Sequence, residues 1–142
     1  MLLRNMQVLE IMKTHVVKTT GEATLAEAAD LLDLYQTTGL PVVDATDVVQ
    51  GMLTESDILR AARTSSGAST ASQCVRDWMT APAICIDENE NVAEAARLML
   101  KRGLKRLPVL TEGGRIVGVL NRIDLLQAVF EGAIDDVFTD GS

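Results

Sequence analysis

The chain has 142 residues, of which 47% are hydrophobic and 23% charged, and this composition indicates a folded globular protein rather than a disordered one. Its formal net charge of −7 excludes a broad basic surface, which argues against nucleic acid and against an anionic membrane as the main partner. The chain has two cysteines and one histidine, and their spacing is not that of a metal site. It also has no apolar run long enough to cross a membrane. We therefore expect a cytoplasmic protein with reduced cysteines.

The sequence contains an internal repeat. An ungapped shift of 67 positions aligns Val8–Ala61 with Val75–Ala128, and the run AEAA occurs in both copies at the same register. The residues between the copies are rich in Ser and Thr, which predicts a flexible linker. We therefore expect one repeat at residues 1–61, a linker at 62–73, a second repeat at 74–130 and an acidic tail at 131–142.

In the first repeat, residues 16–18 predict a short strand. Thr24 and Glu27 then form a capping box, which starts a helix whose apolar residues recur at helical spacing. Gly39 follows near the position where a glycine commonly ends a helix. An apolar strand opened by Pro, a turn at residues 44–47, a second apolar strand and a second helix complete the repeat.

The second repeat predicts the same order, with a strand at residues 83–86, Asn91 as the helix cap and Gly103 as the helix stop. A Glu-Gly-Gly turn at residues 112–114 joins its two later strands. Each repeat is thus a β-α-β-β-α unit of the α+β class. Because about 55 residues bury too little surface to be stable alone, we expect the repeats to pack through their sheets with pseudo-two-fold symmetry, around a cleft with two related pockets.

The segments Gly51–Asp57 and Gly118–Asp124 carry a repeated motif. Thr54 and Asn121 lie at the N-cap of the second helix, where free backbone N–H groups favour phosphate. The final Asp can accept hydrogen bonds from vicinal hydroxyls such as those of a ribose, and the leading Gly lets a planar group or a backbone approach closely. The same pattern is also a capping box with Asp in place of Glu, so a purely structural role explains the motif as well.

These segments, in this order and found twice, resemble a tandem pair of CBS domains, the module named after cystathionine β-synthase. The resemblance covers about Val8 to Ala128 and rests on VLEIMKTHVV and VRDWMTAPAI, the AEAA helices, GLPVVD and KRLPVL, and the motifs GMLTESD and GVLNRID. It implies two β-α-β-β-α repeats packed through their sheets. It also implies a non-catalytic regulatory module that binds AMP, ADP, ATP or S-adenosylmethionine between the repeats, with or without Mg²⁺.

In such pairs the Ser or Thr of the motif meets a phosphate, and its Asp meets the ribose hydroxyls. Thr54 and Asp57 fit both positions, whereas Asn121 departs from the hydroxyl position and Asp124 fits. The residues just before the first strand of each repeat would line the adenine. The ligand-binding residues that the resemblance implies are Thr14, His15, Val16, Gly39, Leu40, Pro41, Thr54, Asp57, Ala81, Ala83, Lys105, Arg106, Leu107, Pro108, Asn121, Arg122 and Asp124.

The two repeats differ in charge. Val8–Ala61 holds three basic and nine acidic residues, whereas Val75–Ala128 holds eight basic and seven acidic residues. We therefore expect a ligand phosphate to meet Lys105, Arg106 and Arg122. The alternative is that these cations belong to a solvated face and complement helix C-termini.

Three functions compete. The first is a sensor that binds an adenosyl small molecule and signals to an effector protein in trans. The second is a ligand-free dimerisation scaffold. The third, an enzyme, is disfavoured because the sequence offers no nucleophile–base pair, metal cluster or glycine-rich phosphate loop, and His15 has no partner at a suggestive spacing. We expect a homodimer, since the second helices carry apolar faces.

Overall fold

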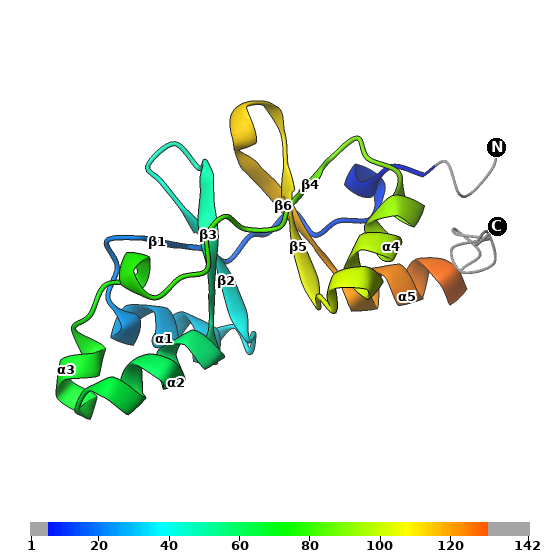
Figure 1. Cartoon of the computed structure of the whole chain (residues 1–142). Helices are drawn as coiled ribbons and strands as arrows, with labels where there is room; N and C mark the ends of the chain where they lie inside the picture. The colour runs from blue at the N-terminus through cyan, green and yellow to red at the C-terminus, as the bar shows by residue number, and fades with distance from the viewer. Residues whose placement is uncertain (1–5, 131–142) are drawn as a thin grey trace. The chain divides into compact units, whose positions relative to one another are not determined.

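The computed structural model describes residues 6–130, so the acidic tail predicted at 131–142 lies outside the described residues. The chain forms two compact units, and each is built around its own three-stranded sheet (Figure 1). The first-sheet unit comprises Val17–Ala83 and Gly113–Arg115. Among the described residues, the second-sheet unit comprises residues 6–16, Ile84–Glu112 and residues 116–130.

The first-sheet unit has the predicted β-α-β-β-α order with one further helix. Its elements are β1 (Thr19–Thr20), α1 (Leu25–Leu34), β2 (Gly39–Val43), β3 (Val49–Thr54), α2 (Glu55–Thr64), α3 (Gly67–Ala71) and the 3-10 turn η3 (Val75–Asp77). Strand β1 runs parallel to β2, and β2 runs antiparallel to β3. Helices α1 and α2 lie on the same side of the sheet (Figure 1). The core between them consists of Leu25, Ala28, Leu32, Leu40, Val42, Leu53, Ala61 and Val75.

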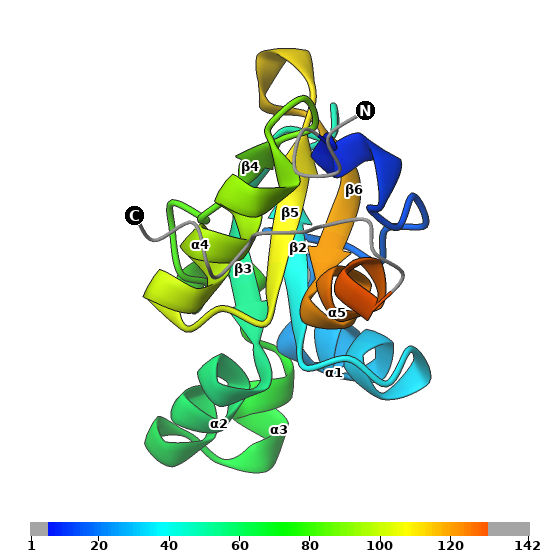
Figure 2. The same cartoon turned by 90° about the vertical axis from the view of Figure 1, so that its right-hand side faces the viewer.

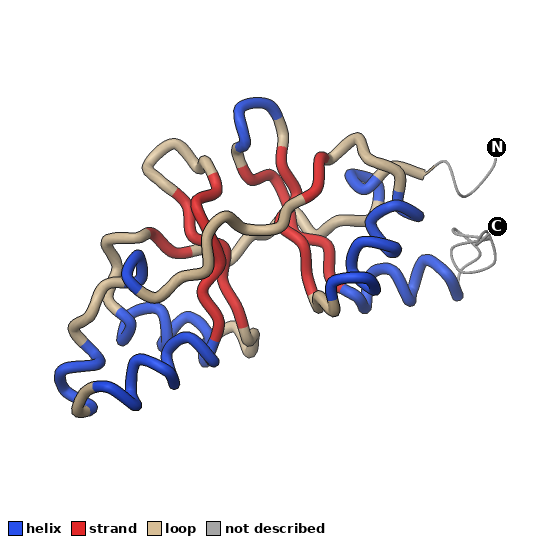
Figure 3. Tube along the Cα trace, in the orientation of Figure 1, coloured by secondary structure: helices blue, strands red, loops and turns tan. Residues whose placement is uncertain are grey.

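The second-sheet unit repeats this plan. Its elements are the 3-10 turn η2 (Val8–Glu10), β4 (Ile86–Asp87), α4 (Val92–Arg102), β5 (Arg106–Leu110), β6 (Ile116–Asn121) and α5 (Arg122–Phe130). The turn η4 (Glu112–Gly114) joins β5 to β6, and its two glycines are grouped with the first-sheet unit. Figure 2 shows α4 and α5 in front of the sheet with β5 seen between them, and Figure 3 shows the helical turn η4 at the tip of the β5–β6 hairpin. The core consists of Val8, Ile86, Val92, Ala95, Ala96, Met99, Leu107, Val109, Leu120, Leu125 and Ala128.

Each unit combines segments from both sequence repeats. Residues 8–13 precede the first repeat's strands but pack on the second sheet, where Lys13 and Val119 exchange backbone hydrogen bonds of 2.9 Å in both directions. Residues 75–80 pack in the same way on the first sheet, where Thr80 and Met52 exchange bonds of 2.9 Å. We call residues 8–13 and 75–80 the crossing segments. Because of them, the compact units are bounded differently from the repeats at 1–61 and 74–130.

Helix starts agree with the sequence, and one helix end does not. Thr24 forms both hydrogen bonds of a capping box, and Asn91 accepts a bond from the Ala93 N–H at 2.8 Å. Gly103 ends α4 in the left-handed conformation, with φ of 64°, as expected. The prediction for Gly39 is wrong: Gly39 pairs in β2, and Gln36 takes the left-handed position with φ of 50°.

The expectation of a flexible linker at residues 62–73 is also corrected. Helix α2 continues through Thr64, and α3 covers Gly67–Ala71. Thr70 is buried, and its hydroxyl lies 2.6 Å from that of Ser65 and donates to the Ser66 carbonyl oxygen at 2.8 Å. The Ser and Thr side chains thus form hydrogen bonds to the local backbone and to one another. Composition alone does not show these bonds, and it therefore predicted a flexible segment.

The first strand of each unit is shorter and later than expected. Strand β1 covers Thr19–Thr20 rather than residues 16–18, since its pairing with β2 begins with Thr19 opposite Val42. Strand β4 covers Ile86–Asp87 rather than residues 83–86. Within residues 6–130, no helix is both long and apolar enough to cross a lipid bilayer.

Candidate functional site

The motif glycines lie under the crossing segments. A Cβ built on Gly118 in β6 would lie 2.9 Å from the carbonyl oxygen of Lys13 and 2.5 Å from the Sδ of Met12. On Gly51 in β3 it would lie 2.6 Å from the carbonyl oxygen of Thr80. Of the two alternatives that the sequence left open, a planar group or a backbone, the structure shows a backbone carbonyl oxygen close to each glycine, joined at Gly118 by the Met12 side chain.

Thr54 and Asp57 form a complete capping box at the start of α2. The Thr54 N–H donates to Asp57 Oδ2 at 2.8 Å, the Thr54 hydroxyl donates to the same oxygen at 3.1 Å, and the Asp57 N–H donates to the Thr54 hydroxyl at 3.4 Å. Arg60 pairs through Nη2 with Oδ1, the other carboxylate oxygen. Asp57 is 2% exposed, so both oxygens of this buried carboxylate have partners within the chain.

Asp124, the counterpart at the start of α5, is bonded at one oxygen. The Asn121 N–H donates to Oδ2 at 2.9 Å. Oδ1 is buried and has no hydrogen-bond partner among residues 6–130. Lys13 Nζ lies 3.5 Å from Oδ1, which is an ion-pair distance but too long for a good N–H···O bond. A buried acceptor without a donor is unfavourable, so Asp124 Oδ1 can gain by accepting a hydrogen bond from a ligand hydroxyl.

A pocket of about 210 Å³ adjoins this carboxylate. Its lining residues are Glu10, Ile11, Lys13, Asp124, Gln127 and Ala128. Thr14, His15 and Val16, the expected adenine-lining residues of the first repeat, directly follow Lys13 and belong to the same unit as Asp124. Crossing therefore groups these three residues with the Asp of the other repeat, in a combination that alignment of the repeats does not suggest.

Ala81 and Ala83 are grouped with Asp57 by the same kind of crossing. They follow Thr80, which is bonded to Met52 in β3, and they belong to the first-sheet unit. Ala81 is exposed and Ala83 is half-buried. Both units thus hold one expected adenine-lining segment and one motif Asp.

The expected phosphate-binding cations come together beside α5. Arg106 lies opposite Asn121 in the β5–β6 ladder, and the Arg122 N–H donates to the Lys105 carbonyl oxygen at 3.1 Å. The Arg122 Nε donates to the Leu104 carbonyl oxygen at 2.6 Å, so this guanidinium also serves the chain just after α4. Both roles considered for these cations, phosphate binding and helix-end complementation, are compatible with this placement.

The remaining expected site residues lie in the paired strands. Leu40 and Leu107 are fully buried and belong to the two hydrophobic cores. Pro41 and Pro108 are buried beside them, and Gly39 pairs opposite the cap residue of α2. The two leucine side chains serve the cores, and the five residues stay predictions as ligand contacts.

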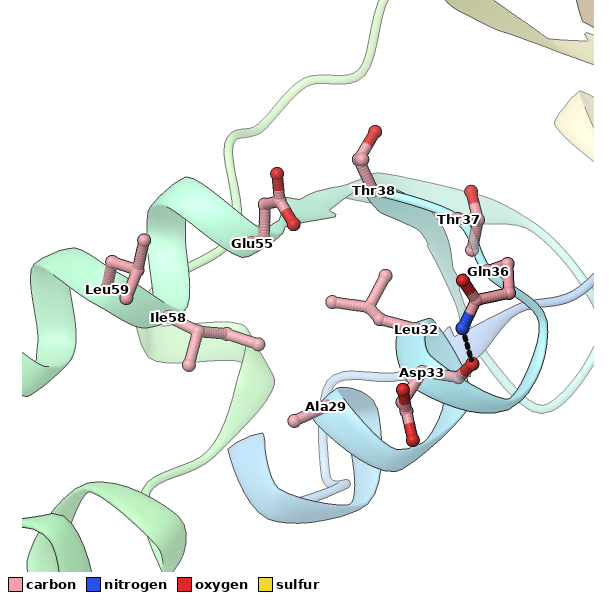
Figure 4. Close-up of a pocket in the computed structure, with 9 residues that line it drawn as sticks. All are labelled: Ala29, Leu32, Asp33, Gln36, Thr37, Thr38, Glu55, Ile58 and Leu59. Atoms are coloured by element: carbon pink, nitrogen blue, oxygen red, sulfur yellow. Dashed lines mark hydrogen bonds between the residues drawn. The ribbon is translucent and has the colours of Figure 1, made fainter.

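A second pocket, of about 500 Å³, lies between α1 and α2. Figure 4 shows Leu32 of α1 and Ile58 of α2 pointing toward one another across it. Its charged lining residues are Asp33 and Glu55, both acidic. An acidic lining repels phosphate, so this pocket does not suit a nucleotide.

Among residues 6–130, no cluster of three or more His, Cys, Asp and Glu side chains is arranged to hold a metal ion. Burial raises the pKa of the Cys85 thiol to about 11, so this cysteine is protonated at neutral pH rather than a reactive thiolate.

Sequence reasoning missed three residues beside the motif aspartates: Lys13, Arg60 and Gln127. The 67-residue shift aligns Arg60 with Gln127, and Lys13 with Thr80. These mismatched pairs were visible in the sequence. Their importance depends on two contacts that the alignment does not reveal. Lys13 reaches Asp124 through a crossing segment, and Arg60 reaches Asp57 from three residues further along the same helix.

Two β-α-β-β-α units, each with a motif Asp at the start of its second helix, define the class of protein. The family model described as CBS domain matches residues 8–64 and again residues 75–131, and the chain therefore belongs to the CBS domain family, with two domains in tandem.

Solved structures of CBS pairs are similar over most of the chain. The crystal structure of CBSX2 in complex with AMP, a protein of Arabidopsis thaliana, is 26% identical with a TM-score of 0.77 and covers 88% of this chain and 96% of that one. The CBS domain pair of protein MJ0100, in complex with 5′-methylthioadenosine and S-adenosyl-L-methionine, is 26% identical with a TM-score of 0.74, covering 89% and 97%.

The chain is also similar to part of an enzyme. Inosine-5′-monophosphate dehydrogenase of Methanocaldococcus jannaschii is 28% identical over 118 residues, which cover 83% of this chain. The chain spans 22% of the length of that relative.

Proposed function

We propose that this chain is a non-catalytic regulatory module that binds an adenosyl ligand, such as AMP, ADP, ATP or S-adenosylmethionine. The observation that carries the proposal is Asp124, a 5% exposed carboxylate with one oxygen bonded to the helix start and the other lacking a hydrogen-bond donor beside a pocket. A carboxylate oxygen has two lone pairs, which suit the two vicinal hydroxyls of a ribose.

The surrounding residues supply the other parts of a nucleotide site. Thr14, His15 and Val16 follow the crossing segment and would line the adenine. Lys105 and Arg106 lie beside α5 and would meet phosphate. The relatives support this class of ligand, because CBSX2 was crystallised with AMP and the MJ0100 pair with two adenosyl compounds.

The output would act on another protein. We propose that the chain forms a homodimer in the cytoplasm and that ligand binding shifts a conformational equilibrium that an effector protein reads in trans. Large apolar side chains exposed on α5, namely Ile123, Leu126 and Phe130, support association through the helices, since exposed apolar groups gathered on one element commonly mark an interface.

Thermal unfolding with a panel of compounds tests the ligand class. A ligand that binds the folded state raises the melting temperature by mass action, by several degrees when its concentration is about a hundred times its Kd. We expect such shifts with one or more of AMP, ADP, ATP and S-adenosylmethionine, and none with inosine or ribose 5-phosphate as matched controls. No shift with any adenosyl compound at millimolar concentration would favour the ligand-free scaffold instead.

A further inference from the structure

We propose that Arg60 closes the site at Asp57, so that the chain binds one adenosyl ligand, at Asp124. Gln127, which takes the place of Arg60 in the second repeat, leaves that site open. This inference rests on the proposed function, because it concerns which of the two related carboxylates receives the ligand.

The two aspartates share the backbone bond at Oδ2, to which Asp57 adds the Thr54 hydroxyl, and they differ in charge pairing at Oδ1. In both, Oδ2 accepts the backbone N–H of the cap residue, at 2.8 Å for Asp57 and 2.9 Å for Asp124. Oδ1 of Asp57 is paired with Arg60, whereas Oδ1 of Asp124 has no hydrogen-bond donor among the described residues. The oxygen that could receive a ribose hydroxyl is therefore occupied in one unit and available in the other.

The position of Arg60 explains why it acts on Asp57. It lies three residues further along α2, where helical geometry brings side chains of the same face together. Its side chain is 52% exposed while that of Asp57 is 2% exposed, so the guanidinium covers the carboxylate from the solvent side. Gln127 has the same spacing from Asp124 but carries no charge, and it can form no ion pair.

The cation near Asp124 is of another kind. Lys13 comes from a crossing segment, its side chain is 61% exposed, and its ammonium lies 3.5 Å from Oδ1. An ammonium on a flexible stem is a mobile, strongly hydrated point charge, whereas a guanidinium offers several fixed donors to a carboxylate. Lys13 therefore leaves Oδ1 without a hydrogen-bond donor and can turn toward a ligand phosphate, while Arg60 competes directly with the ribose hydroxyls.

Exchanging the two residues tests the inference. Isothermal titration with AMP would be run on the full chain and on Arg60→Gln, Gln127→Arg and the double exchange. We expect one AMP per wild-type chain and a second equivalent in Arg60→Gln. We expect Gln127→Arg to weaken the wild-type site by roughly tenfold to a hundredfold, because the ligand must displace a charge-assisted bond. The double exchange should bind one AMP at Asp57, and adding Asp57→Asn to it should abolish that binding.

Arg63→Gln is the matched control, since Arg63 is exposed on the same helix and its replacement removes the same charge. It should leave both stoichiometry and affinity unchanged. Two equivalents bound by the wild type, or one equivalent in Arg60→Gln together with unchanged affinity in Gln127→Arg, would overturn the inference while leaving the proposed function standing. No binding of any adenosyl compound by any of these chains would instead contradict the proposed function.

Discussion

Individual hydrogen bonds and ion pairs determine which acidic side chains of this protein can accept a bond from a ligand. Asp57 and Asp124 occupy equivalent positions, and their Oδ1 atoms differ because Arg60 pairs with Asp57, whereas the uncharged Gln127 has the same spacing from Asp124. The motif can be a structural cap and a ligand site at once: Oδ2 of Asp124 serves the helix start, and Oδ1 is left for a ligand. The capping-box interpretation and the ligand-site interpretation of the motif are therefore compatible in the second repeat.

Asp44 provides a pH-dependent test at this scale. Its Oδ1 accepts bonds from the Thr46 hydroxyl and N–H, both at 2.8 Å, and from the Val48 N–H at 3.0 Å. These bonds, with the Thr46 hydroxyl first, hold the pKa of Asp44 below its ordinary value of 3.8. Because the folded pKa is lowered, the turn is stabilised above pH 3.8 and loses that stabilisation as pH falls through the folded pKa.

In Thr46→Val, which removes the hydroxyl and keeps the backbone donor, we expect the pKa of Asp44 to rise toward 3.8. Carbon-13 NMR titration of the Asp44 carboxyl group measures this directly. Thr37→Val, in a different loop, serves as a control that should leave the Asp44 titration unchanged. An Asp44 pKa that is the same in Thr46→Val and wild type would contradict the assigned cause.

At the scale of elements, the crossing segments hold each unit together. Val8 and Val75 are fully buried in cores built mainly from the other repeat, and each segment bonds to the last strand of that sheet. The motif glycines are needed for this contact, because any Cβ on them would meet a carbonyl oxygen at 2.9 Å or less. Packing therefore explains why Gly occurs at the same position in both repeats.

Gly118→Ala and Gly51→Ala are expected to destabilise the fold by about 1–3 kcal/mol each, the usual cost of overpacking. Gly67→Ala is the matched control, since Gly67 opens α3 and a Cβ there would have no heavy atom within 4 Å. It should be neutral or slightly stabilising, because Ala favours helix. Denaturant unfolding of the three variants measures these changes, and a Gly118→Ala chain as stable as Gly67→Ala would contradict the close approach.

Local signals predicted elements well and long-range contacts poorly. The caps at Thr24 and Asn91 and the stop at Gly103 depend on nearby residues, and the structure confirms them. Gly39 was misassigned because Gln36, bonded to the Asp33 carbonyl oxygen at 2.6 Å, accepts the left-handed conformation instead. Helix α3 was missed because short Ser- and Thr-rich helices depend on contacts with α1 and α2 that composition does not show.

At the scale of the whole molecule, duplication made the fold predictable and divergence made the site hard to predict. The repeat and its motifs were sufficient for the α+β class and the CBS family, both of which the comparisons confirm. The candidate site depends on which crossing segment meets which Asp, and Lys13 and Asp124 are 111 positions apart in the sequence. No local pattern encodes a contact of that range.

The central claim is that the carboxylate of Asp124 receives the ribose of an adenosyl ligand. Asparagine keeps an oxygen for the Asn121 N–H but replaces the second acceptor with a donor, so Asp124→Asn preserves the cap and removes the ligand contact. Isothermal titration of AMP into Asp124→Asn, Asp57→Asn and wild type is the direct measurement. We predict at least a tenfold weaker Kd in Asp124→Asn, on the order of the loss of one charge-assisted bond, and unchanged binding in Asp57→Asn. Wild-type affinity in Asp124→Asn, with binding lost in Asp57→Asn, would contradict the claim.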